Sequence, residues 1–294
     1  MNVLSLFDGI SCGQIALQRS CIDVGVYYAS EINKYAIAVA QHNYPDTVQL
    51  GDVTKISAND LPYIDLLIGG SPCQGFSTSG KKQGFDDPRS KLFFEFVRLR
   101  NKLNPTYWML ENVSLKKEYV DIINYHLGVS PVKINSSLLS AQNRKRLYWA
   151  NFEISQPQNS EINLVDILDL DGKELRKAFI VSRRLNEHGK RDDYNKSIPY
   201  THCLEVNEGN KSNCLTTFEK DNVLTSMPLG RHRDAFKRKL PFRYYTLNEY
   251  CKLQTVPEDY FSGVVLQSQA KRLLGNGWTV DVIAHIFNCM QKSI

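Results

Sequence analysis

No run of apolar residues in this sequence approaches the ~20 residues that a membrane span requires. The largely apolar opening, residues 1–7, ends at Asp8, and neither a basic segment nor a cleavage site follows, so we expect no signal peptide. Internal repeats and low-complexity tracts are also missing. The 294 residues, 42% hydrophobic and 23% charged, are typical of a water-soluble globular protein with one large and one small domain.

The seven cysteines are an odd number and contain no Cys-x-x-Cys pair. This pattern argues against a disulfide framework and against a zinc module. It favours a reduced, cytoplasmic protein without a metal. His202, Cys203 and Cys214 are the residues that suggest a metal site, and we consider that alternative the weaker one.

The net charge of +5 permits a nucleic acid as partner without requiring one. Basic residues gather in two segments, 183–191 and 231–239. Each segment is either a solvated surface or part of a nucleic-acid interface, and the charge alone does not separate the two.

Three predicted strands near the start of the chain each end in an acidic residue. A glycine turn and a helix over 14–19 follow the first strand, an arrangement typical of nucleotide sites because the helix N-terminus is polar. A carboxylate about 20 residues after such a turn can accept both hydroxyls of a ribose. The alternative for each acid is a helix cap or a solvated loop. The strands and acids are 3–7 with Asp8, 24–30 with Glu31, and 48–50 with Asp52.

A fourth predicted strand, 64–68, leads into two glycines, a proline and Cys73. Glycine allows a sharp turn and a close approach to a ligand. Chemistry in open α/β sheets takes place just beyond the carboxyl ends of the strands. Cys73 is therefore a candidate nucleophile, and the alternative is a small buried hydrophobic residue.

A fifth predicted strand, 107–110, ends in Glu111, which is either a second functional carboxylate or an ordinary loop residue. Further on, Gln142, Arg144 and Arg146 are two residues apart, so in a strand they share one face. Two neighbouring guanidinium groups suit a phosphate or a polarised carbonyl. Helices are predicted over 91–102, 116–127 and up to Met290, and a helix with a Thr246/Glu249 capping box begins near 246.

These motifs together resemble those of the DNA cytosine-C5 methyltransferases. The resemblance covers Gly-Ser-Pro-Cys-Gln-Gly-Phe-Ser at 70–77, continues over 80–94, and includes Glu-Asn-Val at 111–113 and Gln-x-Arg-x-Arg at 142–146. It implies an α/β fold, a Rossmann-like S-adenosylmethionine-dependent methyltransferase sheet with helices on both faces, plus a small irregular target-recognition domain. The expected division is a catalytic and cofactor-binding domain at 1–154, target recognition at 155–242, and a C-terminal segment, 243–294, that returns to the catalytic domain.

The resemblance also implies a pocket for S-adenosyl-L-methionine, with S-adenosyl-L-homocysteine as product. The sequence departs from the usual bacterial Phe-x-Gly-x-Gly at residues 7–13, where it is similar to the animal de novo branch, as it is at Trp278. The expected cofactor residues are Phe7, Asp8, Gly9, Ile10, Glu31, Ile32, Asp52, Val53, Gly70, Pro72, Leu92, Asn276 and Trp278.

For catalysis the resemblance implies that Cys73 adds to C6 of a flipped cytosine and that Glu111 neutralises the charge at N3. Arg144 would hold the base carbonyl, and Arg146 would steady the loop or a phosphate. A loop with glycines at 80 and 84 would close over the base. The expected DNA contacts are Gln74, Ser77, Ser79, Lys81, Gln142, Arg144 and Thr216.

We therefore expect a monomeric, cytoplasmic enzyme of bacterial or phage origin that acts on double-stranded DNA, with no membrane or metal as partner. Two alternatives remain. A tRNA cytosine-C5 methyltransferase shares the Cys and Glu-Asn-Val motifs, but the size and basic character of 155–242 favour DNA. A catalytically silent DNA-binding regulator is disfavoured because Cys73, Glu111, Arg144 and Arg146 are all intact.

Overall fold

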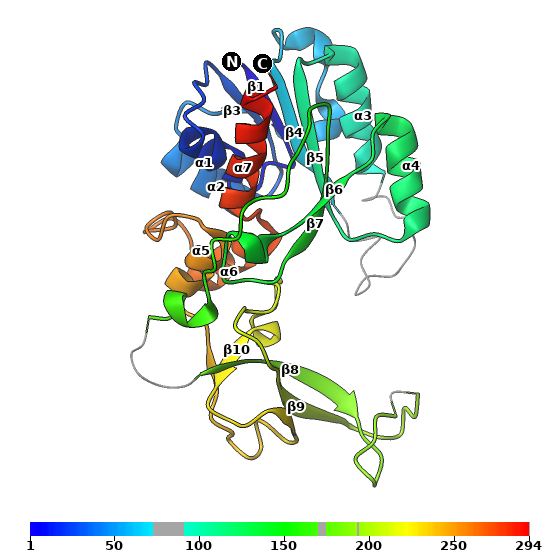
Figure 1. Cartoon of the computed structure of the whole chain (residues 1–294), viewed down its shortest axis with the longest axis vertical. Coiled ribbons are helices and arrows are strands. Elements are labelled where there is room, and N and C mark those ends of the chain that lie inside the picture. The colour runs from blue at the N-terminus through cyan, green and yellow to red at the C-terminus, as the bar shows by residue number, and fades with distance from the viewer. Residues whose placement is uncertain (73–90, 170–174, 193, 294) are drawn as a thin grey trace.

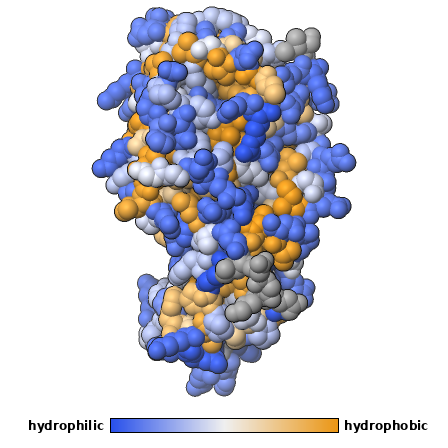
Figure 2. Space-filling view, turned by 90° about the vertical axis from the view of Figure 1, so that its left-hand side faces the viewer, coloured by the Kyte–Doolittle hydropathy of each residue, from blue (hydrophilic) through white to orange (hydrophobic). Residues whose placement is uncertain are grey.

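The computed structural model describes residues 1–72, 91–169, 175–192 and 194–293. Figure 1 shows a large lobe that contains both termini and a smaller lobe built from residues between β8 and β12. In Figure 2 a narrower waist separates the lobes, and hydrophobic side chains on this face are interrupted by hydrophilic ones. Within the described parts, no helix is both long and apolar enough to cross a membrane.

A seven-stranded sheet forms the centre of the large lobe, in the order β3-β2-β1-β4-β5-β7-β6. The first five strands in this order are parallel, and β7 is antiparallel to both of its neighbours. This order is that of a Rossmann-like sheet with an inserted antiparallel strand, which confirms the predicted fold class. The strands are β1 Val3–Leu6, β2 Tyr27–Ser30, β3 Val48–Gln49, β4 Leu66–Gly70, β5 Tyr107–Val113, β6 Val132–Asn135 and β7 Lys145–Ala150.

Helices cover both faces of this sheet because side chains alternate along each strand. In β4, for example, Leu66 and Ile68 pack in one core cluster and Leu67 packs in the other. The first cluster contains residues of α1 Cys12–Arg19, α2 Lys34–Asn43 and α7 Val280–Gln291. The second contains residues of α3 Leu92–Leu103 and α4 Lys117–Leu127. Figure 1 shows α3 and α4 together on one side and α1, α2 and α7 on the other.

The smaller lobe holds a five-stranded antiparallel sheet in the order β11-β9-β8-β10-β12. Sequence patterns leave the topology of this segment open, because three of its strands are only two or three residues long. One face carries a small core around Ile180, Leu204 and Val223. The strands are β8 Arg176–Arg184, β9 Tyr200–Val206, β10 Val223–Thr225, β11 Gly230–His232 and β12 Arg243–Tyr244.

The chain then returns to the large lobe through α5 Leu247–Gln254, α6 Gln267–Asn276 and α7. The predicted capping box at the start of α5 is confirmed. The Thr246 amide donates to the Glu249 carboxylate at 2.8 Å, and the Glu249 amide donates to the Thr246 hydroxyl at 3.1 Å. Glu249 is fully buried and also pairs with Arg243 at 2.7 Å, so this cap joins β12 to α5.

The turn after β1 buries a carboxyl group. Phe7 and Gly9 both have positive φ, near 60°, and they direct the Asp8 side chain inward. Asp8 is only 9% exposed, and it accepts hydrogen bonds from the hydroxyls of Ser11 and Tyr27. Burial raises the pKa of Asp8 from the ordinary 3.8 to about 6, although these hydrogen bonds oppose the shift.

This raised pKa predicts a pH-dependent stability. The folded state holds the Asp8 proton more tightly than the unfolded chain, so the contribution of Asp8 is fully present below about pH 4 and is lost as the pH rises to about 6. The loss is up to about 3 kcal/mol in the free energy of unfolding. Urea unfolding of wild type and Asp8→Asn between pH 4.5 and 7.5 should show the variant gaining relative stability by this order as the pH rises.

The matched control is Asp46→Asn, which replaces an exposed carboxyl group that lies on the loop after α2. Its difference from wild type should stay constant across the same pH range. A constant difference for Asp8→Asn as well would contradict the predicted linkage.

Candidate active site

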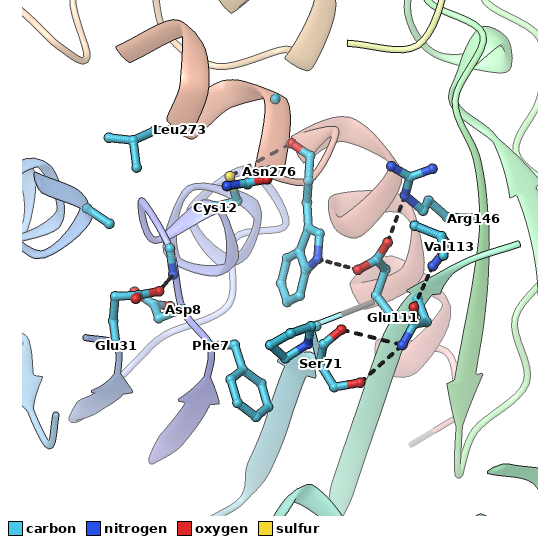
Figure 3. Close-up of a pocket in the computed structure, with 18 of the residues that line it drawn as sticks. Phe7, Asp8, Cys12, Glu31, Ser71, Glu111, Val113, Arg146, Leu273 and Asn276 are labelled. Carbon is cyan, nitrogen blue, oxygen red and sulfur yellow. Dashed lines mark hydrogen bonds and ion pairs between the residues drawn. The ribbon is translucent and has the colours of Figure 1, made fainter. Parts of the chain in front are cut away.

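A cavity of about 290 Å³ opens at the carboxyl edge of β1, β4 and β5, where the strand ends and the segment after α6 meet. Figure 3 shows Phe7, Asp8 and Glu31 on one side of it and Glu111 and Arg146 on the other. Eight of the predicted cofactor residues line this single cavity: Phe7, Asp8, Gly9, Glu31, Gly70, Pro72, Asn276 and Trp278.

Glu111 is the best-positioned carboxylate in the cavity. It is 8% exposed, and different donors bind its two oxygens. Arg146 Nε lies 3.0 Å from Oε1, and Trp278 Nε1 donates to Oε2 at 3.0 Å (Figure 3). These donors come from β7 and from the segment between α6 and α7, so Glu111 is held from two directions.

The structure corrects the predicted end of β5. This strand continues through Glu111 to Val113, because β7 pairs with it beyond Leu110, the last residue of the predicted strand. Glu111 also faces Gly70 of β4 in the parallel register. Glu111 therefore projects from a hydrogen-bonded strand and not from a flexible loop, which fixes its backbone on both sides.

Asn112 anchors the start of the predicted catalytic loop. Its side-chain amide donates to the Ser71 hydroxyl at 3.1 Å and to the Ser71 carbonyl at 3.4 Å (Figure 3). Ser71 immediately precedes Pro72, which lines the cavity. The described chain thus leads to the rim of the cavity next to Glu111. Four predicted site residues and the nucleophile lie in the following stretch, outside the described residues: Cys73, Gln74, Ser77, Ser79 and Lys81.

The two arginines differ in their contacts, and the geometry favours Arg146 over Arg144 as the arginine that acts beside Glu111. Arg144 is 4% exposed, and its guanidinium donates to the backbone carbonyls of Leu215, Gly275 and Gly277 at 3.0, 3.2 and 2.7 Å. Arg144 lines the cavity, but these carbonyls engage both of its terminal nitrogens, so its guanidinium braces the backbone around the cavity. Arg146 is the arginine that contacts Glu111.

The prediction for Arg144 assumed a strand through 142–146. The strand β7 begins only at Lys145, and Gln142 instead forms an isolated bridge with Ser212. Gln142 is fully buried, where its amide donates to Leu253 and Gln254 and its carbonyl accepts from the Leu215 amide. These internal contacts do not support the predicted DNA contact of Gln142.

Thr216 is also committed to internal contacts. Its hydroxyl bonds to Asp221 at 2.7 Å and accepts from the Phe218 amide at 3.1 Å. The backbone beside it is equally close to the rest of the protein: a Cβ on Gly275 would lie 2.2 Å from the Thr216 carbonyl oxygen. The Thr216 hydroxyl thus shapes its own loop, and this arrangement does not support the predicted DNA contact.

Glu31 closes the other end of the cavity. Its Oε2 accepts from the Gly9 amide at 2.8 Å (Figure 3), and its Oε1 accepts from the amides of Ile32 and Asn33, each at 2.8 Å. Three backbone donors therefore hold the carboxylate in the orientation it has in the cavity. Each oxygen has two lone pairs, so Oε2 keeps the capacity to accept a further hydrogen bond from a ligand.

Several predicted cofactor residues do not line the cavity. Ile10 is buried in the first core cluster. Val53 is buried in the second, and the partly buried Leu92 packs against that second cluster. Ile32 is 76% exposed beside Glu31. The Asp52 carboxylate accepts from the amide and hydroxyl of Thr54, and these hydrogen bonds lower its pKa.

The cavity also has lining residues that sequence reasoning missed. Most are direct neighbours of predicted residues, so the motifs pointed to their location without assigning them a role. Cys12 is different, because it begins a helix and burial raises the pKa of its thiol to about 12, which leaves it an inert wall. The missed residues are Cys12, Asn33, Ala36, Ser71, Asn112, Val113, Leu273, Gly275 and Gly277. Among the residues described, no group of three or more His, Cys, Asp or Glu side chains is arranged to hold a metal ion.

Comparison with known proteins identifies what this chain is similar to. The Type II methyltransferase M.NlaX of Neisseria lactamica is 30% identical over 316 residues, which cover 100% of this chain and 97% of M.NlaX. The orphan methyltransferase M.Rho11sI of Bacillus phage rho11s is 33% identical over 218 residues, and the match spans only 43% of that protein. The structure of the Entamoeba histolytica methyltransferase EhMeth superposes with a TM-score of 0.71 at 19% identity, covering 99% of this chain and 98% of EhMeth, and supports the fold.

The sequence model of the C-5 cytosine-specific DNA methylases matches residues 1–292, nearly the whole chain. This match includes both lobes and the segment that carries Trp278. The chain belongs to the C-5 cytosine-specific DNA methylase family.

Proposed function

We propose that this protein transfers a methyl group from S-adenosyl-L-methionine to C5 of a cytosine that has been rotated out of double-stranded DNA. The observation that carries the proposal is that a single cavity contains both an acidic, glycine-lined end with Glu31 and a buried carboxylate, Glu111, next to the start of the Cys73 loop. A family match with DNA methylases and a full-length relative named as a Type II methyltransferase support DNA over tRNA.

The residues of the acidic end suit the proposed cofactor. S-adenosyl-L-methionine supplies an electrophilic methyl group and carries positive charge on its sulfur. Asp8 and Glu31 give this end of the cavity two carboxyl groups, and Phe7 and Trp278 add aromatic surface. Gly9 has positive φ and leaves room for close approach, since a Cβ there would meet no atom within 4 Å. We assign Phe7, Glu31, Asn276 and Trp278 to holding the cofactor.

Cytosine C5 is a poor nucleophile, and the proposed mechanism makes it a better one. The Cys73 thiolate forms a bond to C6, and the displaced ring electrons are stabilised at N3 by the carboxyl group of Glu111. C5 would then form its bond to the methyl group of S-adenosyl-L-methionine as the methyl–sulfur bond breaks, and S-adenosyl-L-homocysteine would leave with that electron pair. Loss of the C5 proton restores the C5–C6 double bond and expels Cys73 as thiolate, so the enzyme returns to its starting state.

Arg146 is the residue that we propose contacts the base carbonyl. It lies beside Glu111 in the cavity, and its Nη2 is 3.9 Å from Cys214 Sγ, a weak contact that leaves this donor available. A base that meets Glu111 at N3 places its adjacent carbonyl on the same edge. The Glu111–Arg146 pair therefore offers an acid and a donor to one edge of cytosine.

The smaller lobe offers a surface for the DNA backbone. Leu224 of β10 packs with the core of the large lobe, and Lys177 is its partner in register, so both lie on the face directed to that lobe. Arg183, on β8, lies on this same face of the sheet. Glu205 on β9 and Arg231 on β11 also lie on it, as the register of the paired strands shows. Glu205 holds Arg231 at 2.8 Å and Arg183 at 3.5 Å, which leaves this cluster with net positive charge.

The two sequence relatives named above are a bacterial and a phage protein, and we propose that this enzyme likewise acts in the cytoplasm on bacterial or phage DNA, as a monomer. The two lobes are consistent with a division of labour in which 1–154 carries the chemistry and 155–242 carries target recognition.

The nucleophile can be tested directly by trapping. DNA with 5-fluorocytosine at the target cannot lose a proton from C5, so wild type should remain covalently bound on a denaturing gel, and Cys73→Ala should form no such band. Glu111→Gln should bind the same duplex while labelled-methyl transfer falls by ~10²–10⁴. Full transfer activity in Cys73→Ala would end the proposal, and bisulfite sequencing of the product DNA would identify the target cytosine.

Substitutions of the two arginines should have different effects, one mainly on stability and the other mainly on catalysis. Arg144→Lys leaves backbone carbonyls without donors in the interior, so its free energy of unfolding should fall by roughly 2–4 kcal/mol. Arg146→Lys keeps a cation near Glu111 but loses the planar guanidinium and its arrangement of N–H donors. Its kcat should fall by about 100-fold, with a smaller change in stability. Urea unfolding measures the stability of each variant, and labelled-methyl transfer measures its kcat. The opposite pattern, with Arg146 structural and Arg144 catalytic, would restore the roles predicted from sequence.

Arg231 should contribute to DNA affinity without regard to sequence. Arg231→Gln should weaken binding to both target and non-target duplexes and reduce the slope of log Kd against log salt by about 1, as expected for one lost phosphate contact. The control, Lys102→Gln, removes the same charge from an exposed position on α3. Fluorescence anisotropy at several salt concentrations measures the slope, and equal slopes for the two variants would count against this surface.

A further inference from the structure

Trp278 lies where the cofactor end of the cavity meets Glu111. Its side chain lines the cavity, and its Nε1 donates to Glu111 Oε2 at 3.0 Å, one of the bonds drawn at Glu111 in Figure 3. Arg146 binds the other oxygen of the same carboxylate. A carboxylate with one donor on each oxygen is restrained in rotation, whereas Arg146 alone would leave Oε2 free to turn.

Gly70 makes room for the indole. A Cβ added to Gly70 would lie 2.9 Å from Trp278 Nε1, closer than real Cβ contacts, and 3.0 Å from Glu111 Oε2, which is tighter than most of them. The indole–carboxylate pair therefore packs directly against the backbone of β4, and this backbone limits where the indole can move.

The segment that carries Trp278 is itself held firmly. Arg144 donates to the carbonyls of Gly275 and Gly277, and Gln254 donates to the carbonyl of Gly277 at 3.1 Å. After the tryptophan, the Thr279 hydroxyl donates to Gln254 at 2.9 Å. Hydrogen bonds on both sides of Trp278 thus fix the backbone from which the indole reaches Glu111.

We propose that Trp278 is a positioning residue for Glu111, an inference that rests on the proposed function. The indole N–H orients Oε2 for the edge of the extruded base. The same indole forms a wall of the cofactor end of the cavity. A molecule bound at that end therefore contacts the ring that holds Glu111. Binding of the cofactor product and binding of the extruded base are therefore coupled through Trp278, and such coupling is reciprocal.

Replacement of Trp278 by phenylalanine separates the ring from its N–H. Trp278→Phe keeps an aromatic wall, so the Kd for S-adenosyl-L-homocysteine, measured by calorimetry, should change less than about threefold. It loses one buried hydrogen bond to a charged group, so kcat should fall by about tenfold while KM for DNA changes little. If Trp278 served only as a wall of the cavity, the variant would show the reverse: a raised Kd for S-adenosyl-L-homocysteine with kcat unchanged. That result would overturn the proposal.

The matched control is Trp149→Phe. Trp149 is fully buried in the core on the α3 and α4 side of the sheet, where its indole N–H donates to Asn124 at 2.7 Å. This variant also loses an indole hydrogen bond, but the bond lies away from the cavity. Its kcat should stay within about twofold of wild type in the folded protein. A tenfold loss here too would show that any lost indole bond impairs the enzyme, and would remove the support for Trp278.

A double-mutant cycle tests whether Trp278 acts through Glu111. S-adenosyl-L-homocysteine should increase the affinity of wild type for a duplex mismatched at the target cytosine, where the base is already easy to extrude. This coupling factor should shrink by at least about threefold in Trp278→Phe and in Glu111→Ala, and no further in the double variant. Independent, multiplying losses would contradict the proposal. If wild type transfers no methyl group to DNA cytosine, the proposed function fails; if it does but Trp278→Phe behaves as wild type, only this inference fails.

Discussion

A single buried guanidinium joins the three parts of the chain that the cavity needs. Arg144 precedes β7 of the central sheet, and it binds the carbonyl of Leu215 near the smaller lobe and those of Gly275 and Gly277 between α6 and α7. Burial lowers the pKa of Arg144, but its partners are fixed carbonyl dipoles that compensate the charge inside the protein. Together with the hydrogen bonds of Gln254 to Gly277 and Thr279, this tie holds the segment with Trp278 against Glu111.

Two carboxyl groups of the cavity lie apart from Glu111 and Arg146, a separation that suits the proposed methyl transfer. Asp8 and Glu31 lie at one end, and Arg146 lies at the other beside Glu111 (Figure 3). Carboxyl groups favour a cationic cofactor, whereas a guanidinium favours the carbonyl edge of a base. Burial raises the pKa of Asp8 to about 6, so the charge of the acidic end depends on pH in this range.

The places of the strands can be predicted from the sequence to within a few residues, because apolar runs and the residues that follow them are local features. These patterns place Phe7, Glu31, Gly70 and Glu111 at one edge of the sheet, and in the fold the four residues line one cavity. The roles of Gln142 and Arg144 could not be predicted in the same way. Whether a polar side chain in a motif faces a ligand or the interior depends on distant partners such as Leu253 and Gly277.

The smaller lobe shows the same limit in a different form. Its strands β10, β11 and β12 are too short to show a period of two, and their pairing with β8 and β9 joins segments far apart in the sequence. The basic character of the smaller lobe was evident from the sequence. In the structure it corresponds to Arg183 and Arg231 on the face directed to the large lobe. Glu205 on β9 lies between Arg183 on β8 and Arg231 on β11, and this place in the sheet has a physical reason. The two guanidinium groups share one face and repel, and one shared carboxylate lets both stay there with a net positive charge.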